Sequence, residues 1–163
     1  MAVLGYFFTW TCYGTWLHGD NRGSYDRHGE TSRRRYLDAD PQRERAVRRS
    51  MRHQAIQMTG PMRKCVREAI TQHCDFKHWQ LSALNVRTNH VHVVVSAPDA
   101  TASHALNSLK ARATRRLRDC SLLKSDQPIW TSRGSQVVLK DLESFNRAVH
   151  YVNFEQGPAL PDE

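Results

Sequence analysis

The sequence predicts an α+β fold: a four-stranded antiparallel sheet of the ferredoxin-like or RRM-like split βαβ type, with helices on one face. Three observations lead to this prediction. Apolar stretches rich in β-branched or aromatic residues predict four strands, at residues 5–13, 79–86, 91–95 and 136–140. Apolar residues at helical spacing separate them in the order β-α-β-β-α-β. A further helical pattern follows the last strand, which adds a C-terminal helix to the fold.

The first strand is predicted at residues 5–13 (GYFFTWTCY), where aromatic and β-branched residues are concentrated. Four glycines between residues 14 and 29 predict a long loop after it. Residues 31–60 are polar and rich in Arg, and predict a basic surface insertion within a single domain that spans residues 1–163. Part of the insertion, from Pro41 to Met58, lacks an internal helix breaker and can be helical.

A helix is predicted to begin at Pro61, because proline is tolerated in the first turn of a helix. Apolar residues recur at helical spacing from there to His73. Thr88 and Asn89 form the predicted turn between the strands at 79–86 and 91–95, so these strands form a hairpin.

The next helix is predicted to start at Thr101 or Ser103, either of which can act as the N-cap, and to run to about Arg118. After the strand at 136–140, Asp141 is the predicted cap of the last helix. Gly157-Pro158 ends this helix.

The charge of the chain is strongly positive and is concentrated in two clusters. The chain has 24 Lys and Arg against 16 Asp and Glu, a formal net charge of +8. Eleven basic residues and three acidic ones lie between Arg33 and Arg67, and residues 110–118 add five basic residues without an acid. This distribution favours a nucleic-acid partner, and Arg112, Arg115 and Arg116 become candidate DNA contacts. A solvated helical face is the simpler alternative.

Membrane insertion and structural zinc binding find little support in the sequence. No apolar run approaches the ~18 residues of a spanning helix. The four cysteines form no Cys-x-x-Cys pair, and the spacing of Cys65, His73, Cys74 and His78 matches no closed zinc site. We expect Cys74 to be a buried thiol. Unpaired thiols favour a reducing cytoplasm, where a DNA-binding protein would associate with the nucleoid.

Two histidines separated by one residue form the most informative chemical pattern. His90 and His92 lie in a predicted strand, where side chains two residues apart point to the same face, with Cα atoms about 7 Å apart. Two parallel imidazoles on a sheet can bind one divalent cation. We expect this face to be open, so that loss of either side chain costs little stability. Two solvated surface histidines are the alternative.

The last predicted helix carries a tyrosine away from its apolar stripe. At 100° per residue, Phe145, Val149 and Val152 form the buried stripe, whereas Tyr151 and Glu155 fall on the opposite side. A tyrosine and a carboxylate one turn apart therefore share one exposed face. In a fold of this type, such a helix can lie across the sheet that bears the histidines.

At these residues the sequence resembles a known family. His90-Val91-His92 resembles the His-hydrophobic-His motif of HUH transposases, and the segment from Tyr151 to Gly157 resembles their single-tyrosine motif. The REP-associated tyrosine transposases and their insertion-sequence relatives are the most similar group. Residues 9–16 and 130–134 are also similar to segments of one branch of this group.

The resemblance implies a metal-dependent nuclease and strand transferase that acts on single-stranded or hairpin DNA. Tyr151 would attack a phosphodiester to give a 5′-phosphotyrosine and a free 3′-hydroxyl. His90, His92 and a polar residue near the tyrosine would hold Mg²⁺ or Mn²⁺, and Arg133, in a matching Arg-Gly pair, would contact DNA. Members of the family form homodimers, and in some of them the partner subunit supplies the tyrosine helix.

Two adjacent residues are candidates for the third metal ligand. Many relatives carry Gln or Asn four residues after the tyrosine, but here that position is Glu155 and the glutamine is Gln156. Regular helix geometry favours Glu155, because Gln156 would fall within the apolar stripe. The resemblance favours Gln156, which can reach the site if the helix loosens before Gly157.

Three other functions remain compatible with the sequence. An RRM-like sheet with basic flanks can bind nucleic acid without catalysis. A domesticated copy of a transposase would act as an endonuclease that processes hairpin DNA. A two-histidine, one-carboxylate iron oxygenase would need a deep apolar pocket, which a small open sheet rarely provides.

Overall fold

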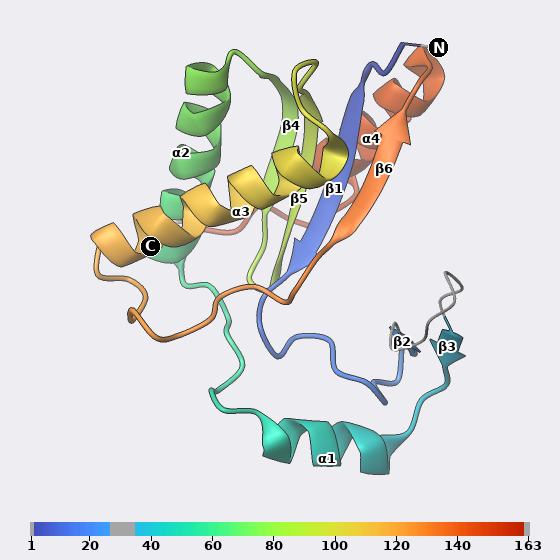
Figure 1. The fold of residues 1–163 in the computed structure, drawn as a ribbon, viewed down its shortest axis with the longest axis vertical. Helices are drawn as coiled ribbons and strands as arrows, with labels where there is room; N and C mark the ends of the chain where they lie inside the picture. Colours follow the sequence, from blue (N-terminus) through green and yellow to red (C-terminus); the bar gives the residue numbers. More distant parts are fainter. Residues whose placement is uncertain (1, 27–34, 162–163) are drawn as a thin grey trace. The chain divides into compact units, whose positions relative to one another are not determined.

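The computed structural model describes residues 2–26 and 35–161. These residues separate into two compact units, Met1–Cys12 with Gln57–Glu163 as the first and Tyr13–Ile56 as the second. The elements of the first unit are shown in Figure 1: β1 (Gly5–Thr11), α2 (Gly60–Lys77), β4 (Gln80–Val86), β5 (His90–Ser96), α3 (Ala102–Asp119), β6 (Ser135–Leu139) and α4 (Leu142–Phe154).

The first unit contains a four-stranded sheet with the order β4-β5-β1-β6. All neighbouring strands are antiparallel, and β4 and β5 form the predicted hairpin. Two helices connect strands that are not neighbours in the sheet, which is the split βαβ arrangement. The predicted α+β class and the antiparallel four-stranded sheet are confirmed.

One face of the sheet is covered by α2 and α3; in Figure 1, α3 crosses in front of the strands and α2 lies to the left, next to β4. The strands contribute side chains that alternate along the chain, as the two-residue period of a strand requires. The helices contribute the apolar stripes that their sequences predict. The fully buried residues of this layer include Phe8, Trp10, Val66, Ile70, Val91, Val93, Val95, Leu106 and Leu109.

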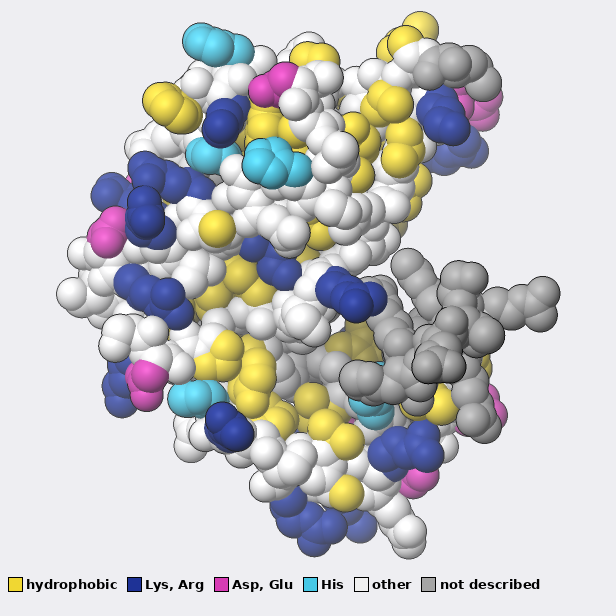
Figure 2. All heavy atoms as spheres, in the orientation of Figure 1, with side chains coloured by type: hydrophobic (Ala, Val, Ile, Leu, Met, Phe, Trp, Pro, Cys, Tyr) yellow, Lys and Arg dark blue, Asp and Glu magenta, His cyan; other side chains and the backbone are white. Residues whose placement is uncertain are grey.

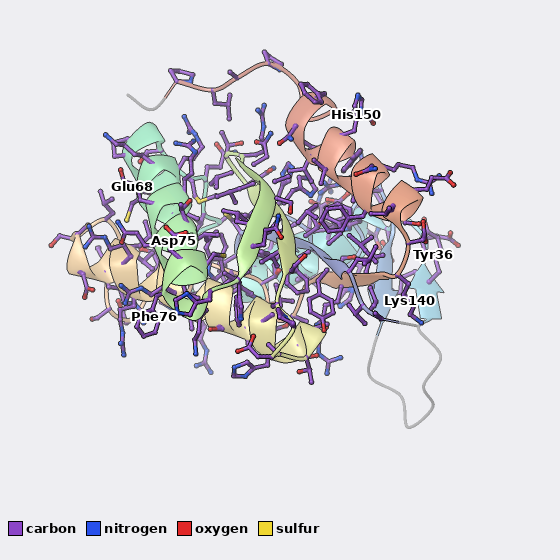
Figure 3. All side chains as sticks on the ribbon, turned by 90° about the horizontal axis from the view of Figure 1, so that it is seen from above. Tyr36, Glu68, Asp75, Phe76, Lys140 and His150 are labelled. Carbon is purple, nitrogen blue, oxygen red and sulfur yellow. The ribbon has the colours of Figure 1, made fainter. Side chains whose placement is uncertain are left out.

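The opposite face of the sheet is covered by α4. Ala148 and Val152 of this helix form a buried cluster with residues of three strands, namely Ala83, Val94 and Leu139. In Figure 3, α4 and α3 lie on opposite sides of the sheet. The two connecting helices thus lie on one face, and the added C-terminal helix lies across the sheet that bears the histidines, both as expected. The expectation that the histidine face is open is wrong. The apolar stripe of α4 needs burial, and the apolar residues of this face provide it.

Side-chain caps fix where the helices begin. Thr59, Thr101 and Asp141 accept backbone hydrogen bonds at the starts of α2, α3 and α4, so the predicted caps at Thr101 and Asp141 are confirmed. At its other end, α4 stops at Phe154. Gly157 follows with a φ of 81°, a left-handed conformation that glycine adopts without strain.

The second unit holds a two-stranded sheet of β2 (Ser24–Asp26) and β3 (Arg35–Leu37), followed by α1 (Pro41–Ser50). The unit begins earlier than the predicted insertion, and the strand β2 lies in the segment predicted to be a loop. α1 is shorter than the predicted helical stretch and buries none of its residues. Arg33 and Arg34, the first residues of the basic cluster, lie outside the described residues.

Among the described residues of the basic clusters, two are buried. Arg63 is 6% exposed and donates a hydrogen bond to the Met58 carbonyl oxygen. Lys110 is 9% exposed, and its Nζ donates to the carbonyl oxygens of Thr131 and Arg133, at 2.9 and 2.5 Å. These two cations therefore stabilise loops of the fold and are not available as DNA contacts.

The buried ammonium group of Lys110 is expected to make stability depend on pH. Burial lowers the pKa of Lys110 from 10.5 to about 8. Between these values the unfolded chain binds more protons than the folded one, so the lysine makes the free energy of unfolding rise with pH. We expect the difference in unfolding free energy between wild type and Lys110→Met to grow across this window in urea titrations. A difference independent of pH would contradict the assignment.

The cysteines agree with the predicted reduced thiols. Cys12, Cys65 and Cys74 are buried and Cys120 is exposed, and all four are free. Burial is the main cause that raises the pKa of Cys74 to about 12, so this thiol stays protonated. Within residues 2–26 and 35–161, no helix is both long enough and apolar enough to cross a membrane.

Candidate functional site

The two histidines of β5 face α4 and lie beside each other. The centroids of the His90 and His92 rings are 4.7 Å apart. Each ring has an oxygen partner at Nδ1, Asn89 Oδ1 at 2.6 Å for His90 and Thr9 Oγ1 at 2.8 Å for His92. If each Nδ1–H donates to its partner, both Nε2 atoms keep a free lone pair. Such partners commonly orient histidines that bind metal ions.

Burial keeps both imidazoles neutral. His92 is only 5% exposed. Burial lowers the pKa of His92 to about 4, and the charges of His90 and Arg87 act in the same direction. The pKa of His90 is also lowered, mainly by burial and further by Arg87. Only the neutral ring can donate a lone pair to a metal ion, so both residues are in the binding form near neutral pH.

The ring of Tyr151 lies against this pair. Its centroid is 5.6 Å from that of His92 and 5.9 Å from that of Phe7, and both contacts are edge-on. Tyr151 is 38% exposed, so its phenol is reachable from solvent. The helix that covers the histidines thus brings a possible nucleophile to them from the same chain.

Of the two candidate third ligands, only Gln156 lies at the histidines. Its side chain lies within hydrogen-bonding reach of both rings when they are protonated, which opposes the lowering of the pKa of His90 and of His92. Its Nε2 donates to the Tyr151 carbonyl oxygen at 3.2 Å. Glu155 instead lies 3.2 Å from Nδ1 of His150, on the outer side of α4 (Figure 3). Regular helix angles favoured Glu155, but they do not apply to Glu155 and Gln156, because the helix has already ended at Phe154.

Two residues at the end of β4 were missed by the sequence analysis. Asn85 lies opposite His92 in the sheet, and its Nδ2 donates to the Val152 carbonyl oxygen at 3.0 Å. Arg87 donates to the Pro158 carbonyl oxygen at 2.8 Å. These bonds hold the end of α4 and the segment beyond it on the histidine face. The sequence did contain a sign of this role. Asn85 and Arg87 are two polar residues, two positions apart, at the end of the strand that pairs with the histidine strand.

The candidate DNA-binding arginines do not gather at this site. Arg112, Arg115 and Arg116 belong to α3, on the other side of the sheet from the histidines. Arg133 lies in the loop before β6. A neighbouring residue of this loop, Thr131, donates its backbone N–H to the Thr11 carbonyl oxygen at 3.0 Å. Thr11 pairs with His90, so this loop joins the end of the sheet that holds the histidines.

The donor atoms at the site fit a divalent cation. Two neutral imidazoles and one amide oxygen would leave coordination positions open for phosphate oxygens, and amide oxygens are donors that Mg²⁺ and Mn²⁺ accept. Among the described residues, no three His, Cys, Asp or Glu side chains come together in a possible metal site. A third protein ligand at the histidines would therefore come from another residue type, and the Gln156 amide lies beside them.

Paired histidines on a sheet of this type, faced by a tyrosine from a covering helix, are typical of the tyrosine transposases. A family model described as "Transposase IS200 like" matches residues 45–137. The chain belongs to this family of IS200-like transposases. The matched segment contains His90 and His92 and ends before α4, so Tyr151 and Gln156 lie beyond it.

A solved structure supports the fold. The chain is similar to the REP-associated tyrosine transposase bound to a REP hairpin, with 15% sequence identity and a TM-score of 0.50. The similarity covers 93% of this chain and 66% of that one. At this identity the likeness shows the fold alone. No curated protein matches the chain.

Proposed function

We propose that this chain is a transposase that cuts and rejoins single-stranded or hairpin DNA through a covalent bond to Tyr151. The observation that carries the proposal is the contact of the Tyr151 ring with His92, at 5.6 Å, in a chain of the IS200-like family. Through this contact, the proposed nucleophile Tyr151 lies beside the proposed cation ligand His92, and solvent can reach Tyr151.

The proposed reaction begins with attack of the Tyr151 oxygen on a phosphorus atom of the DNA backbone. The phenol loses its proton, the bond from phosphorus to the 3′ oxygen breaks, and this oxygen takes up a proton as a hydroxyl. The products are a 5′-phosphotyrosine and a free 3′-hydroxyl end. Another 3′-hydroxyl can reverse the step, because the phosphotyrosine conserves the energy of the broken bond.

The phenol needs help, because its ordinary pKa near 10 makes it a weak nucleophile at neutral pH. A bound Mg²⁺ or Mn²⁺ would stabilise the negative charge that develops on the phosphoryl oxygens. His90, His92 and Gln156 would hold this cation. Asn85 and Arg87 would keep Tyr151 and Gln156 in place through their bonds to the carbonyl oxygens of Val152 and Pro158.

The remaining parts of the proposal concern partners and organisation. Arg133 contacts the DNA strand from the loop beside the histidine end of the sheet, and Arg112, Arg115 and Arg116 contact DNA from α3. The two units act together as one transposase domain, to which residues 31–60 contribute a basic, solvent-exposed insertion. One chain carries all four site residues, so a homodimer serves to bring two cut ends together. Its DNA partner places the protein at the nucleoid.

Cleavage of labelled single-stranded oligonucleotides tests this function. Wild-type protein with Mg²⁺ or Mn²⁺ is expected to cut a strand that contains a hairpin, and to remain attached to the fragment 3′ of the cut after denaturation. EDTA should stop the reaction. Cleavage that continues in EDTA would contradict the proposed role of the cation. A protein that binds the strand without cutting it would support a binding module instead.

Comparison of two neighbouring variants tests the third ligand. Gln156→Ala is expected to weaken Mn²⁺ binding by about 10- to 100-fold and to reduce cleavage, because one oxygen donor is lost. Glu155→Ala should leave both properties unchanged, because its carboxylate pairs with His150 on the outer side of α4. Calorimetric titration with Mn²⁺ measures the affinity. If Glu155→Ala instead loses Mn²⁺ affinity and cleavage while Gln156→Ala keeps both, the third ligand is Glu155.

A further inference from the structure

A groove lies between α2 and α3, on the side of the sheet away from the histidines. Its volume is about 770 Å³. The site described above accounts for none of the residues that line this groove. The side chains that matter for its chemistry are His73, Phe76, Ser108, Arg112, Arg115 and Arg118.

An aromatic ring at the groove is unusually exposed. Phe76, near the end of α2, is 77% exposed (Figure 3). The apolar stripe of α2 that packs on the sheet includes Val66, Ile70 and Cys74, all fully buried. Phe76 lies outside this stripe and is not needed for the core. An exposed aromatic ring beside positive charge is a platform on which an unpaired base can stack.

Three arginines follow one another at three-residue spacing along α3, which places them on one side of that helix. Among the described residues, no carboxylate forms an ion pair with Arg112, Arg115 or Arg118. Figure 2 shows Lys and Arg side chains over the region of α2 and α3. The groove itself has no acidic residue in its lining.

The groove is formed before any ligand arrives. His73 Nε2 and Ser108 Oγ, both in the lining of the groove, are 2.6 Å apart and join the two helices. The His73 ring also packs edge-on against Trp79, with centroids 5.7 Å apart. A groove with fixed walls loses little conformational freedom on binding.

We propose that this groove is a second DNA site, which binds a single-stranded segment away from the cleavage site. Phosphates of the segment contact Arg112, Arg115 and Arg118, and one base stacks on Phe76. The complementarity of charge identifies the ligand as a polyanion, and the exposed ring selects an unpaired strand, since paired bases do not expose their faces. The proposed function already assigns Arg112 and Arg115 to DNA, and the proposal rests on it in taking the polyanion to be DNA; Phe76, Arg118 and the unpaired state of the strand are new.

The test measures binding of a fluorescent oligothymidine by anisotropy, in EDTA so that no cleavage occurs. Phe76→Ala is expected to weaken binding about tenfold, and Phe76→Trp to restore it, because stacking needs a ring. Arg112→Gln and Arg115→Gln should each reduce the slope of log affinity against log salt by about 0.7. Phe154→Ala and Arg147→Gln change an equally exposed phenylalanine and an exposed arginine on α4, and should bind like wild type.

The proposal is overturned if the groove variants bind the oligothymidine with wild-type affinity. It is also overturned if the α4 control variants lose as much affinity as the groove variants. The same variants are then tested for the covalent protein–DNA adduct. An adduct that forms while Phe76→Ala binds normally refutes the groove and leaves the proposed function intact. If Phe76→Ala binds weakly but the wild-type protein forms no adduct, the result supports the groove as a DNA site and refutes the proposed covalent chemistry.

Discussion

Replacement of Tyr151 by Phe is expected to reduce DNA cleavage by at least about 1000-fold, because loss of a nucleophile removes the covalent route. The variant lacks one oxygen and keeps the ring that packs on Phe7 and His92. Folding and DNA affinity should therefore stay near wild type. Denaturing electrophoresis with labelled single-stranded DNA measures both the cut strand and the covalent adduct.

Tyr6→Phe is the matched control for this experiment. It also removes a phenol oxygen, which donates a hydrogen bond to the Ala100 carbonyl oxygen at 2.9 Å, far along the strand from the histidines. We expect a loss of about 1 kcal/mol in stability and normal cleavage. An adduct of equal yield in the Tyr151 variant would show that another residue attacks. Cleavage without an adduct in wild type would make water the nucleophile.

Replacement of His92 by Ala is expected to abolish Mn²⁺ binding and cleavage, and also to destabilise the fold by about 2 kcal/mol. The stability loss follows from burial, because the ring is 5% exposed, packs against Phe7 and Tyr151, and hydrogen-bonds Thr9. His90→Ala should also abolish Mn²⁺ binding and cleavage, but with a smaller loss of stability, because His90 is only partly buried. Urea unfolding and calorimetric Mn²⁺ titration separate the two effects.

The control for the histidine variants is His150→Ala. This side chain lies on the outer side of α4 (Figure 3) and pairs with Glu155, so its loss should change neither metal binding nor cleavage. Full cleavage by the His90 or His92 variant in the presence of Mn²⁺ would contradict their role as ligands. Equal stability of the His90 and His92 variants would contradict the difference in burial.

The sequence by itself determined the elements of the first unit and their order, but not the strands of the second unit. The strand at 91–95 and the helix from Thr101 could be predicted, because side-chain period and capping chemistry are local properties of the chain. The pairing of His90 with His92 followed from the same two-residue period. The family resemblance added the role of Tyr151, which local patterns could not supply.

The tertiary structure decided how these parts meet. α4 covers the histidine face because its apolar stripe packs against Val94 and Ala83 of that face, and this packing buries His92. The choice between Glu155 and Gln156 depended on where the helix ends, which regular helix geometry cannot show. Lys110 belonged to a basic cluster in the sequence but is buried under a loop, because its ammonium group bonds two backbone carbonyl oxygens. In each case the deciding contacts join residues far apart in the chain, and a local pattern carries no information about them.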